Sequence, residues 1–464
     1  MKGNQIVHKK NRAYKMNLIV FIWQVIYSLS VIQVLNRVRN SKFNNITFKA
    51  GALYFVIFLL FLMTILLTTF ILFVHYKNQL LIRQVGIAQI EQNIESAIEL
   101  YSVKPEIIGD NPTTSVRIFL DSPSIVNIKQ EPWGVYQIIS FTANFKQIER
   151  TKFALFGSKY GSIPPTAIYM TDKDRYLSVC GNSKIVGNCF LPRLGMRTAR
   201  IEGKLFDGTI ENREGFIHPS SKELSSPPEK LMANCKSLLN GEFNGIVKQS
   251  DALIGVKRVF NSFTDTLVTY TSSNKFWSIE NISITGKIDL YSGNEIYISP
   301  SAKLQNTIIA ARKVIVKSRF EGCIQIFATD TIIIEKNVRL LYPSSIAVID
   351  SKANQKLIFI DKSCEIQGAV WIWNPIGDNN LSPIIKIEPG TIVKGQVFSS
   401  GKIQLKADIW GTIFAEQFFL NTPNAYYENY LFNSIIDGEK LPSNFACLPF
   451  VFDYNEMQFI DWLY

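Results

Sequence analysis

The spacing of apolar residues changes along the chain, from one long uninterrupted run to short alternating segments. Residues 51–74 read GALYFVIFLLFLMTILLTTFILFV, a run of 24 residues without a charged side chain. At about 1.5 Å per residue, a helix of this length spans the roughly 30 Å hydrocarbon core of a bilayer. The pattern therefore predicts an N-terminal transmembrane helix over 51–74.

Behind this run, apolar side chains recur at alternating spacings of three and four residues, at Ile87, Ile90, Ile94, Ala97 and Tyr101. This spacing marks one face of a helix and predicts an amphipathic helix over 75–101. The stripe of Ile87, Ile90 and Ile94 could pair with the same stripe of another helix, or it could pack against the chain's own domain.

Residues 102–170 contain strand-like segments such as SIVNIKQ and WGVYQIISFTANF, with turn residues at 121–123 and 132–134. Alternating segments bounded by Pro, Gly, Asp and Ser are typical of strands joined by turns. We therefore predict a small β subdomain over 102–170, and no pattern within it indicates catalytic chemistry.

A repeat dominates the rest of the chain. A unit of the form apolar-x-Gly-x-apolar occurs seven times, centred on Gly187, Gly203, Gly286, Gly322, Gly368, Gly395 and Gly411. Short alternating strands, such as those at 314–316 and 332–334, precede many units, and their basic spacing is 18 residues. Repeats of this length bury their apolar faces only by stacking on neighbouring coils. We therefore predict a mainly β fold built on a parallel β-helix, a solenoid of ~18-residue coils. The main competitor is an antiparallel sandwich, but the repeat has few hairpin signals.

Breaks in the repeat divide this part of the chain. We expect the first β-helix coils at 171–206, an insertion at 207–277 that includes a helix from Glu229 to Leu239, and the main β-helix at 278–421. The aromatic-rich residues 422–464 are predicted to form a C-terminal cap, because an open end of a solenoid has to be protected from edge-to-edge pairing.

The segments KVIVKSRFEGCIQIFATDTIIIEKNVRL and IIKIEPGTIVKGQVFSSGKIQLKADIWGTIFAEQFFL resemble bactofilins, over roughly residues 280–420. That family is β-helical and forms polymers, so the resemblance implies a self-associating solenoid. The apolar helix that follows basic residues and continues as an amphipathic helix resembles minor pilins and pseudopilins, over about residues 49–101. This second resemblance implies a membrane-anchored assembly component.

Charge is concentrated at the N-terminus and orients the predicted helix. The formal net charge is +11, and residues 1–50, the basic cytoplasmic flank, hold nine basic and no acidic side chains. By the positive-inside rule the protein is single-pass, with a cytoplasmic N-terminus and an exterior or periplasmic C-terminal domain. A second apolar segment at 18–35 would reverse this orientation if it also spanned the membrane. The other 414 residues carry only +2, so no nucleic-acid partner is expected.

Motifs for a metal, a cofactor or catalysis are missing from the sequence. There is no HExxH, CxxC, GxxxxGK[ST] or GxSxG motif, so we expect no cofactor and no metal, and we predict that the protein is not an enzyme. Cys180 and Cys189 are the only closely spaced cysteines and could form a disulfide in an exterior compartment. Cys189, however, occupies an inward position of the repeat, which favours a buried thiol.

The sequence therefore predicts a membrane-anchored structural or assembly protein, such as a pilus- or secretion-associated scaffold, with itself or other envelope proteins as partners. The alternative is a surface protein that binds or cleaves polysaccharide, because β-helices can align carboxylates on one face. Glu335, Asp361 and Glu388 each follow a repeat strand and could lie in such a row, although a solvated polar corner explains them as well.

Overall fold

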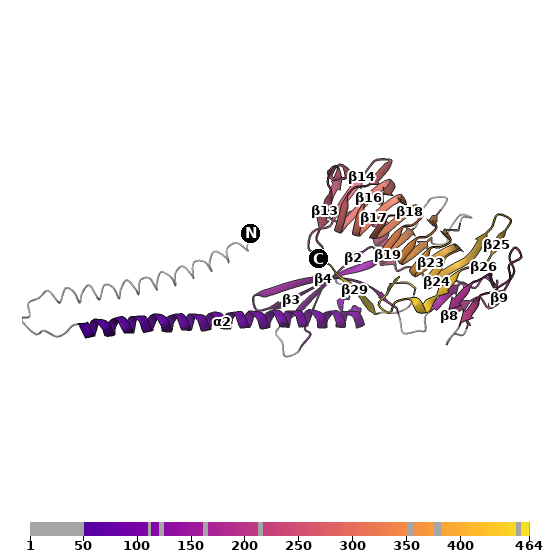
Figure 1. Cartoon of the computed structure of the whole chain (residues 1–464). Helices are drawn as coiled ribbons and strands as arrows, with labels where there is room; N and C mark the ends of the chain where they lie inside the picture. The colour runs from indigo at the N-terminus through magenta and orange to yellow at the C-terminus, as the bar shows by residue number, and fades with distance from the viewer. Residues whose placement is uncertain are drawn as a thin grey trace, which may run out of the picture. The chain divides into compact units, whose positions relative to one another are not determined.

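The computed structural model describes residues 51–109, 113–119, 125–160, 166–211, 217–349, 356–374, 382–451 and 456–463. Over these ranges the chain is mainly β with one long apolar helix near its N-terminus, α2 (Gly51–Val103), as the sequence predicts (Figure 1). The chain divides into two compact units, one up to Ile82 and one from Arg83 to Tyr464. The apolar segment at 18–35 lies outside the described residues.

Helix α2 runs without a break through both predicted helices, 51–74 and 75–101. Its apolar part is fully exposed and has a mean hydropathy of 2.9, so the helix is long and apolar enough to cross a membrane. The hydroxyls of Thr64, Thr68 and Thr69 donate hydrogen bonds to helix carbonyls, at 2.7, 2.7 and 2.9 Å. These three polar groups are therefore satisfied within the helix, as a hydrocarbon environment requires.

An antiparallel sheet of six strands forms one layer of the second unit. Its order is β1-β2-β3-β4, with β28 and β29 both paired to β4. One face packs on the part of α2 that belongs to this unit, since Ile94 and Tyr101 share a core with Phe141 and Phe156. The predicted β subdomain at 102–170 is therefore completed by strands from the end of the chain. The strands are β1 (Thr113–Val116), β2 (Val126–Trp133), β3 (Tyr136–Phe145), β4 (Ile148–Lys159), β28 (Ala446–Cys447) and β29 (Met457–Leu463).

A second sheet of 20 strands is parallel except for the pairing of β25 with β24. Three further strands, β6 (Leu177–Cys180), β9 (Met196–Thr198) and β26 (Tyr430–Phe432), pair separately. The large sheet contains β5 (Thr166–Met170), β7 (Lys184–Val186), β8 (Asn188–Leu191), β10 (Thr209–Glu211), β11 (Ile217–Pro219), β12 (Ile246–Gln249), β13 (Arg258–Asn261), β14 (Val268–Ser272), β15 (Phe276–Ile279), β16 (Ser283–Ile298), β17 (Lys303–Val316), β18 (Glu321–Ile334), β19 (Arg339–Ile349), β20 (Leu357–Ile360), β21 (Glu365–Trp373), β22 (Ile384–Ile387), β23 (Ile392–Leu405), β24 (Asp408–Asn421), β25 (Tyr426–Glu428) and β27 (Ile435–Asp437).

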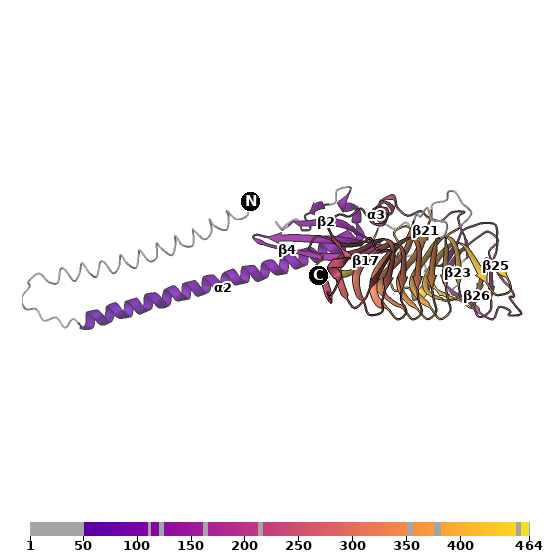
Figure 2. The same cartoon turned by 90° about the horizontal axis from the view of Figure 1, so that it is seen from above.

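The parallel pairs follow the period of the sequence repeat. Val314 lies opposite Ile332, and Ile385 lies opposite Ile403, which is 18 residues further along in both cases. Figure 2 shows these strands one behind another, with β2 and β4 beside them. Six strands, β18, β19, β21, β23, β22 and β20, pair in a closed parallel circuit. Alternate side chains of the parallel strands fill one continuous apolar core.

Four of the apolar-x-Gly units, at Gly286, Gly368, Gly395 and Gly411, lie inside long strands where the backbone has a positive φ. Gly395 and Gly411 have φ angles of +152° and +148°, and a Cβ on Gly395 would lie 1.9 Å from the carbonyl oxygen of Gly368. Only glycine permits this backbone conformation and this close approach of neighbouring strands. The unit at Gly203 is different, because it lies beside an isolated antiparallel bridge. The repeat predicts that the apolar residue two positions after each glycine points inward; for Leu205 this is wrong, since it is 66% exposed.

The strands of the large sheet are not arranged in chain order. β5 pairs with β24, and β27 pairs with both β24 and β7, so the early strands lie beside the last ones. The range 207–277, predicted as an insertion, contributes β10 to β15 to the sheet, and the range 422–464, predicted as a cap, contributes strands to both sheets. The strands within 207–277 are only three to five residues long and lack the glycine unit, which is why the sequence repeat does not reveal them.

Between the two sheets lies a second apolar core. The outward side chains of the parallel strands, such as Phe327 and Trp371, pack there against Trp133 and Leu155 of the antiparallel sheet. Helix α3 (Glu229–Leu239) has the predicted bounds and adds Met232 to this core. Within the described ranges, the remaining helical elements are the short 3₁₀ turns η1 (Pro105–Ile108), η2 (Ser250–Leu253) and η3 (Gly438–Lys440).

Candidate functional site

A cleft of about 700 Å³ lies where the antiparallel sheet, helix α3 and the first long parallel strand meet. The antiparallel sheet contributes side chains from β2, β3 and β4, and β16 contributes the floor. The loops after α3 and between β13 and β14 supply the remaining wall. Polar lining residues include Lys129, Glu131, Ser140, Thr142, Thr151, Asn234, Ser237, Glu242, Asn244, Thr264, Asp265, Lys287 and Asp289.

Asp289 is a buried carboxylate at the floor of this cleft. Its strand neighbours Ile288 and Leu290 are fully buried in the core of the parallel sheet, so alternation directs Asp289 to the other side, toward the antiparallel sheet. The residue is only 5% exposed, and its Oδ1 has no hydrogen-bond partner among the described residues. Burial raises the pKa of Asp289 to about 7, and the nearby Lys287 ammonium offsets this effect only in part.

Thr269 adds a second unpaired polar atom beside Asp289. The two residues lie directly opposite each other on the paired strands β14 and β16. Thr269 is fully buried, and its Oγ1 also lacks a hydrogen-bond partner within the part of the chain that the structure describes. Buried polar atoms are nearly always hydrogen-bonded in folded proteins, so two orphans at neighbouring positions call for an explanation.

Glu131 occupies the wall of the cleft and is ionised. Lys129 and Lys287 donate hydrogen bonds to its carboxylate at 2.6 and 2.8 Å. Burial acts to raise the pKa of Glu131, but these two ammonium groups outweigh it and lower the pKa below its ordinary value. Lys287 thereby ties strand β16 to strand β2, and the cleft holds one buried carboxyl and one charge-paired carboxylate.

Aromatic rings support the cleft on two sides. Trp133 and Phe263 meet edge to face, with ring centroids 5.5 Å apart, and both are buried. Phe243, from the loop after α3, meets Tyr291 of β16 in the same way at 4.9 Å. These contacts fix the loops that form the wall.

The predicted disulfide residues are two free, buried thiols. Cys189 lies in the core of the parallel sheet, whereas Cys180 belongs to a separate small cluster with Ile201 and Leu420. Burial raises the pKa of Cys189 to about 12 and that of Cys180 to about 11. Both thiols therefore act as small apolar side chains.

The helical stripe lies against the chain's own sheet. Ile90 and Ile94 are fully buried in the core that α2 shares with β2–β4, and Ile87 is partly buried. A Cβ on Gly86 would lie 2.6 Å from the Phe145 ring, so the helix and sheet are in close contact here. Of the two predicted alternatives, the structure therefore has the stripe packed on its own domain.

The three carboxylates of the polysaccharide hypothesis do lie in one row. The backbone N–H of Glu335, Asp361 and Glu388 donates to the strand one repeat before, as does that of Lys317 at one end of the row and Lys406 at the other. Lys317 donates to Glu335 at 2.8 Å, which outweighs partial burial and lowers the pKa of Glu335. The row is thus a charged corner bounded by lysines.

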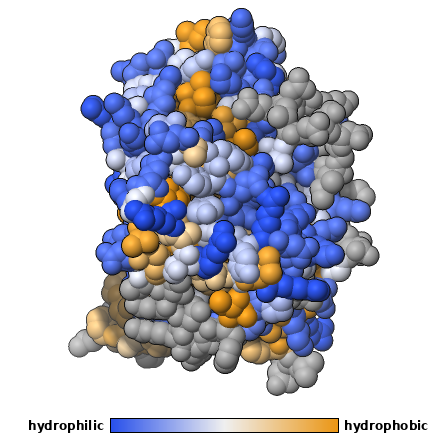
Figure 3. Space-filling view, turned by 90° about the vertical axis from the view of Figure 1, so that its right-hand side faces the viewer, coloured by the Kyte–Doolittle hydropathy of each residue, from blue (hydrophilic) through white to orange (hydrophobic). Residues whose placement is uncertain are grey.

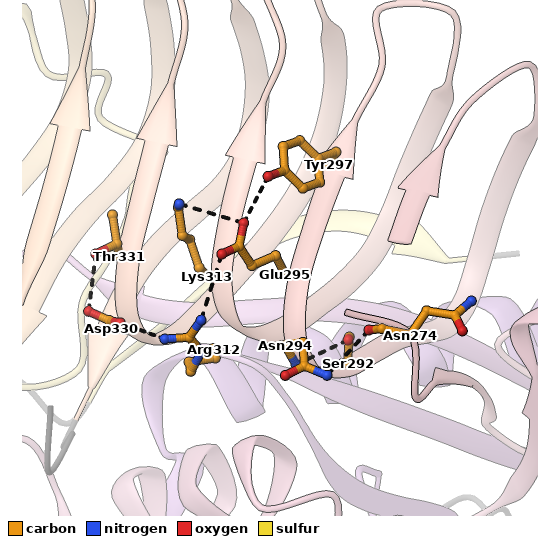
Figure 4. Close-up of polar contacts among 9 residues, drawn as sticks. All are labelled: Asn274, Ser292, Asn294, Glu295, Tyr297, Arg312, Lys313, Asp330 and Thr331. Carbon is orange, nitrogen blue, oxygen red and sulfur yellow. Dashed lines mark hydrogen bonds and ion pairs between the residues drawn. The ribbon is translucent and has the colours of Figure 1, made fainter. Parts of the chain in front are cut away.

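A second polar network crosses β16, β17 and β18 (Figure 4). Tyr297 donates to Glu295 at 2.8 Å, and Arg312 and Lys313 each lie 3.6 Å from the same carboxylate. Arg312 also reaches Asp330 at 3.3 Å. Since the Arg312 side chain is 51% exposed, each pair contributes at most about 1 kcal/mol, and the network ties successive strands together.

Among the described residues, no group of three or more His, Cys, Asp or Glu side chains is arranged to hold a metal ion. The cleft around Asp289 gave no signal in the sequence, because its lining comes from several separate segments between Lys129 and Ile308. Comparison of the chain with protein-family models, curated proteins and solved structures finds no match. The resemblances to bactofilins and to minor pilins therefore stay predictions.

Proposed function

We propose that the protein is a membrane-anchored structural component in which α2 spans the membrane and the parallel strands form a β-helix outside the cytoplasm. In this proposal two copies associate through one end of the β-helix. The observation that carries it is an uncovered strand edge with exposed apolar side chains at that end.

Support for the anchor comes from the first unit. Residues 51–74 are apolar and uncharged, and their side chains are exposed. Exposure of so many apolar side chains is unfavourable in water and favourable in a lipid bilayer. The nine basic residues within 1–50 favour a cytoplasmic N-terminus by the positive-inside rule. In this proposal the second unit lies on the opposite side of the membrane.

Support for a β-helix comes from how the long strands divide their partners. The first part of β18 pairs with β19 and its last part pairs with β20, and β23 likewise receives β21 and β22 on different parts. A bent strand with two parallel partners is expected when each coil stacks on the next. The closed circuit of six strands then consists of successive coils whose segments are joined at the bends.

The end formed by β12, η2 and β13, which we call the β12 end, offers an interaction surface. All four residues of β12 are exposed, and among the described strands the residues of β12 pair in register only with β14. Ile254 and Phe260 are 78% and 57% exposed. Beside them lies a hollow of about 420 Å³ whose lining includes Leu253 and Trp277. Exposed edge strands and apolar groups of this kind mark association sites.

The β12 end is suited to a second copy related by a two-fold axis, because the projecting Ile254 and the hollow belong to the same surface. The opposite end, at β9 and β11, is mainly hydrophilic, with small scattered apolar groups (Figure 3). An isologous pair through the β12 end leaves that opposite end free.

Sedimentation of the full chain in detergent tests this association. The wild type is expected to form a dimer, and I254K and F260K are expected to be monomers, because each places an ammonium group in the apolar contact. L205K is the matched control, since Leu205 is 66% exposed near the opposite end. A monomeric wild type, or unchanged association of both β12-end variants, would contradict the proposal.

The alternative from the sequence, action on polysaccharide at Asp361 and Glu388, has less support. Their row ends in Lys317 and Lys406, and Gln404 donates to Glu388 at 3.5 Å, so the row is a solvated corner tied to its neighbours.

A further inference from the structure

The cleft between the two sheets contains a buried carboxyl group and many polar side chains that have no part in the proposed membrane anchoring or pairing of copies. We propose that this cleft binds a neutral oligosaccharide, with Asp289 at its floor accepting a hydrogen bond from a sugar hydroxyl. This inference is independent of association at the β12 end, because Asp289 and the residues that line the cleft differ from those of that end.

At the floor of the cleft, no described residue donates a hydrogen bond to Asp289 Oδ1. Asp289 lines the cleft and is only 5% exposed, and its Oδ1 has no hydrogen-bond partner among the described residues. Thr269, opposite it in register, has an unpaired hydroxyl as well. A ligand that donates to Asp289 would remove the penalty of leaving a buried carboxyl oxygen unbonded.

The charged groups of the lining favour an uncharged ligand over an anion. The lining holds two basic groups, Lys129 and Lys287, and both are bound to Glu131, so neither is free to bind an anion. An anionic ligand would also meet the carboxylates of Glu242 and Asp265. An uncharged ligand avoids this repulsion and leaves the ion pairs of Glu131 in place.

The side chains along the cleft walls favour a polar ligand. Hydroxyl and amide side chains line the walls, from Ser140, Thr142 and Thr151 on the sheet to Asn234 and Ser237 on α3. Each can donate as well as accept, so together they suit a ligand with many hydroxyl groups. Phe153 and Phe243 supply apolar ring surface of the kind on which sugar rings pack.

The size of the cleft suits an oligosaccharide. A volume of about 700 Å³ lies within the range of sites that hold a complete small ligand. The cleft is partly open to solvent, so the ends of an oligosaccharide could extend out of it.

Isothermal titration of the full chain tests the proposal, in a detergent without a sugar headgroup so that the detergent does not compete. The probes are maltotetraose and chitotetraose as neutral oligosaccharides, tetragalacturonate as an anion and spermine as a cation. We expect at least one neutral probe to bind and the charged probes not to bind.

D289N is the decisive variant. Asparagine keeps the shape of the side chain. At pH 8, above the pKa of about 7 that burial gives Asp289, the wild-type carboxylate accepts a charge-assisted hydrogen bond and the asparagine amide only a neutral one, so we expect about tenfold weaker binding at this pH. D289A removes the acceptor and is expected to abolish binding. D361N, on the charged corner outside the cleft, is the matched control and should bind as the wild type does. Unfolding curves of D289N establish that its loss of affinity is not a loss of fold.

Three outcomes would overturn the proposal: no heat with either neutral tetrasaccharide, stronger binding of spermine or tetragalacturonate than of the neutral probes, or binding that D289N and D289A leave unchanged. Sedimentation of the same samples keeps the two proposals apart, since D289N should not alter association at the β12 end.

Discussion

Replacing Asp289 by asparagine should make the protein more stable at neutral and alkaline pH. The ordinary pKa of an aspartate is 3.8, and burial raises the pKa of Asp289 to about 7 in the folded chain. Between these values the folded state holds a proton that the unfolded state has released. The contribution of the protonated carboxyl is therefore fully present below about pH 4 and is lost as pH rises through about 7.

The size of the effect follows from the two pKa values. Linkage gives a loss of about 1.7 kcal/mol at pH 5 and about 4.3 kcal/mol at pH 8, relative to strongly acidic solution. Asparagine does not titrate, so the difference in unfolding free energy, variant minus wild type, should grow by about 2.6 kcal/mol between these two pH values. Other titrating groups, including Lys287 and Glu131, are present in both proteins and cancel in the difference.

Guanidinium unfolding of the second unit, followed by tryptophan fluorescence at pH 5 and pH 8, measures this difference. D361N serves as the control, because Asp361 is only partly buried and already accepts a backbone hydrogen bond at 2.8 Å. A variant-minus-wild-type difference that is flat with pH, or that shrinks toward pH 8, would refute the account of Asp289 as a buried carboxyl held against its ionisation.

Three further results are expected. G395A should lower the unfolding free energy, measured by thermal melts, by several kcal/mol. The added Cβ would lie 1.9 Å from the Gly368 carbonyl oxygen, at a residue whose φ is +152°. G195A is the control, because Gly195 also has a positive φ but open space around it, so its loss of stability reports the φ effect without the clash. I94D should destabilise the second unit by roughly 3–5 kcal/mol, because Ile94 is fully buried, yet leave association at the β12 end intact by sedimentation once the variant is refolded at low temperature. Protease added to intact cells or spheroplasts should cleave the second unit if it lies outside the cytoplasm, and protection until the membrane is permeabilised would reverse the proposed orientation.

The local patterns of the sequence predicted the elements but not their partners. The uncharged run at 51–74, the helix from Glu229 to Leu239 and the 18-residue strand spacing depend on neighbours close in sequence, and the structure has all three. The prediction that Leu205 points inward was wrong because a turn can have the same apolar-x-Gly sequence as a strand that bends.

Asp289 shows why the cleft could not be predicted. Its sequence neighbours Ile288 and Leu290 indicate only that its side chain points away from one core. Whether that side is solvent or protein depends on β2, about 150 residues earlier, where Lys287 meets Glu131. Burial of the carboxyl, and with it the raised pKa, is thus a product of how the two sheets are brought together.

The pairing of β5 with β24 has a consequence for synthesis. Ile168 lies opposite Ile413, and Ile185 lies opposite Ile436. Each strand therefore pairs with a strand that is synthesised about 250 residues later. Contacts this distant in sequence slow folding. While the chain is emerging, β5 and β7 have no such partner to cover them, and a truncated product would keep them uncovered for good. A chain that stops before β24 and β27 would therefore expose strand edges of β5 and β7, and uncovered edges are sites where other chains can pair.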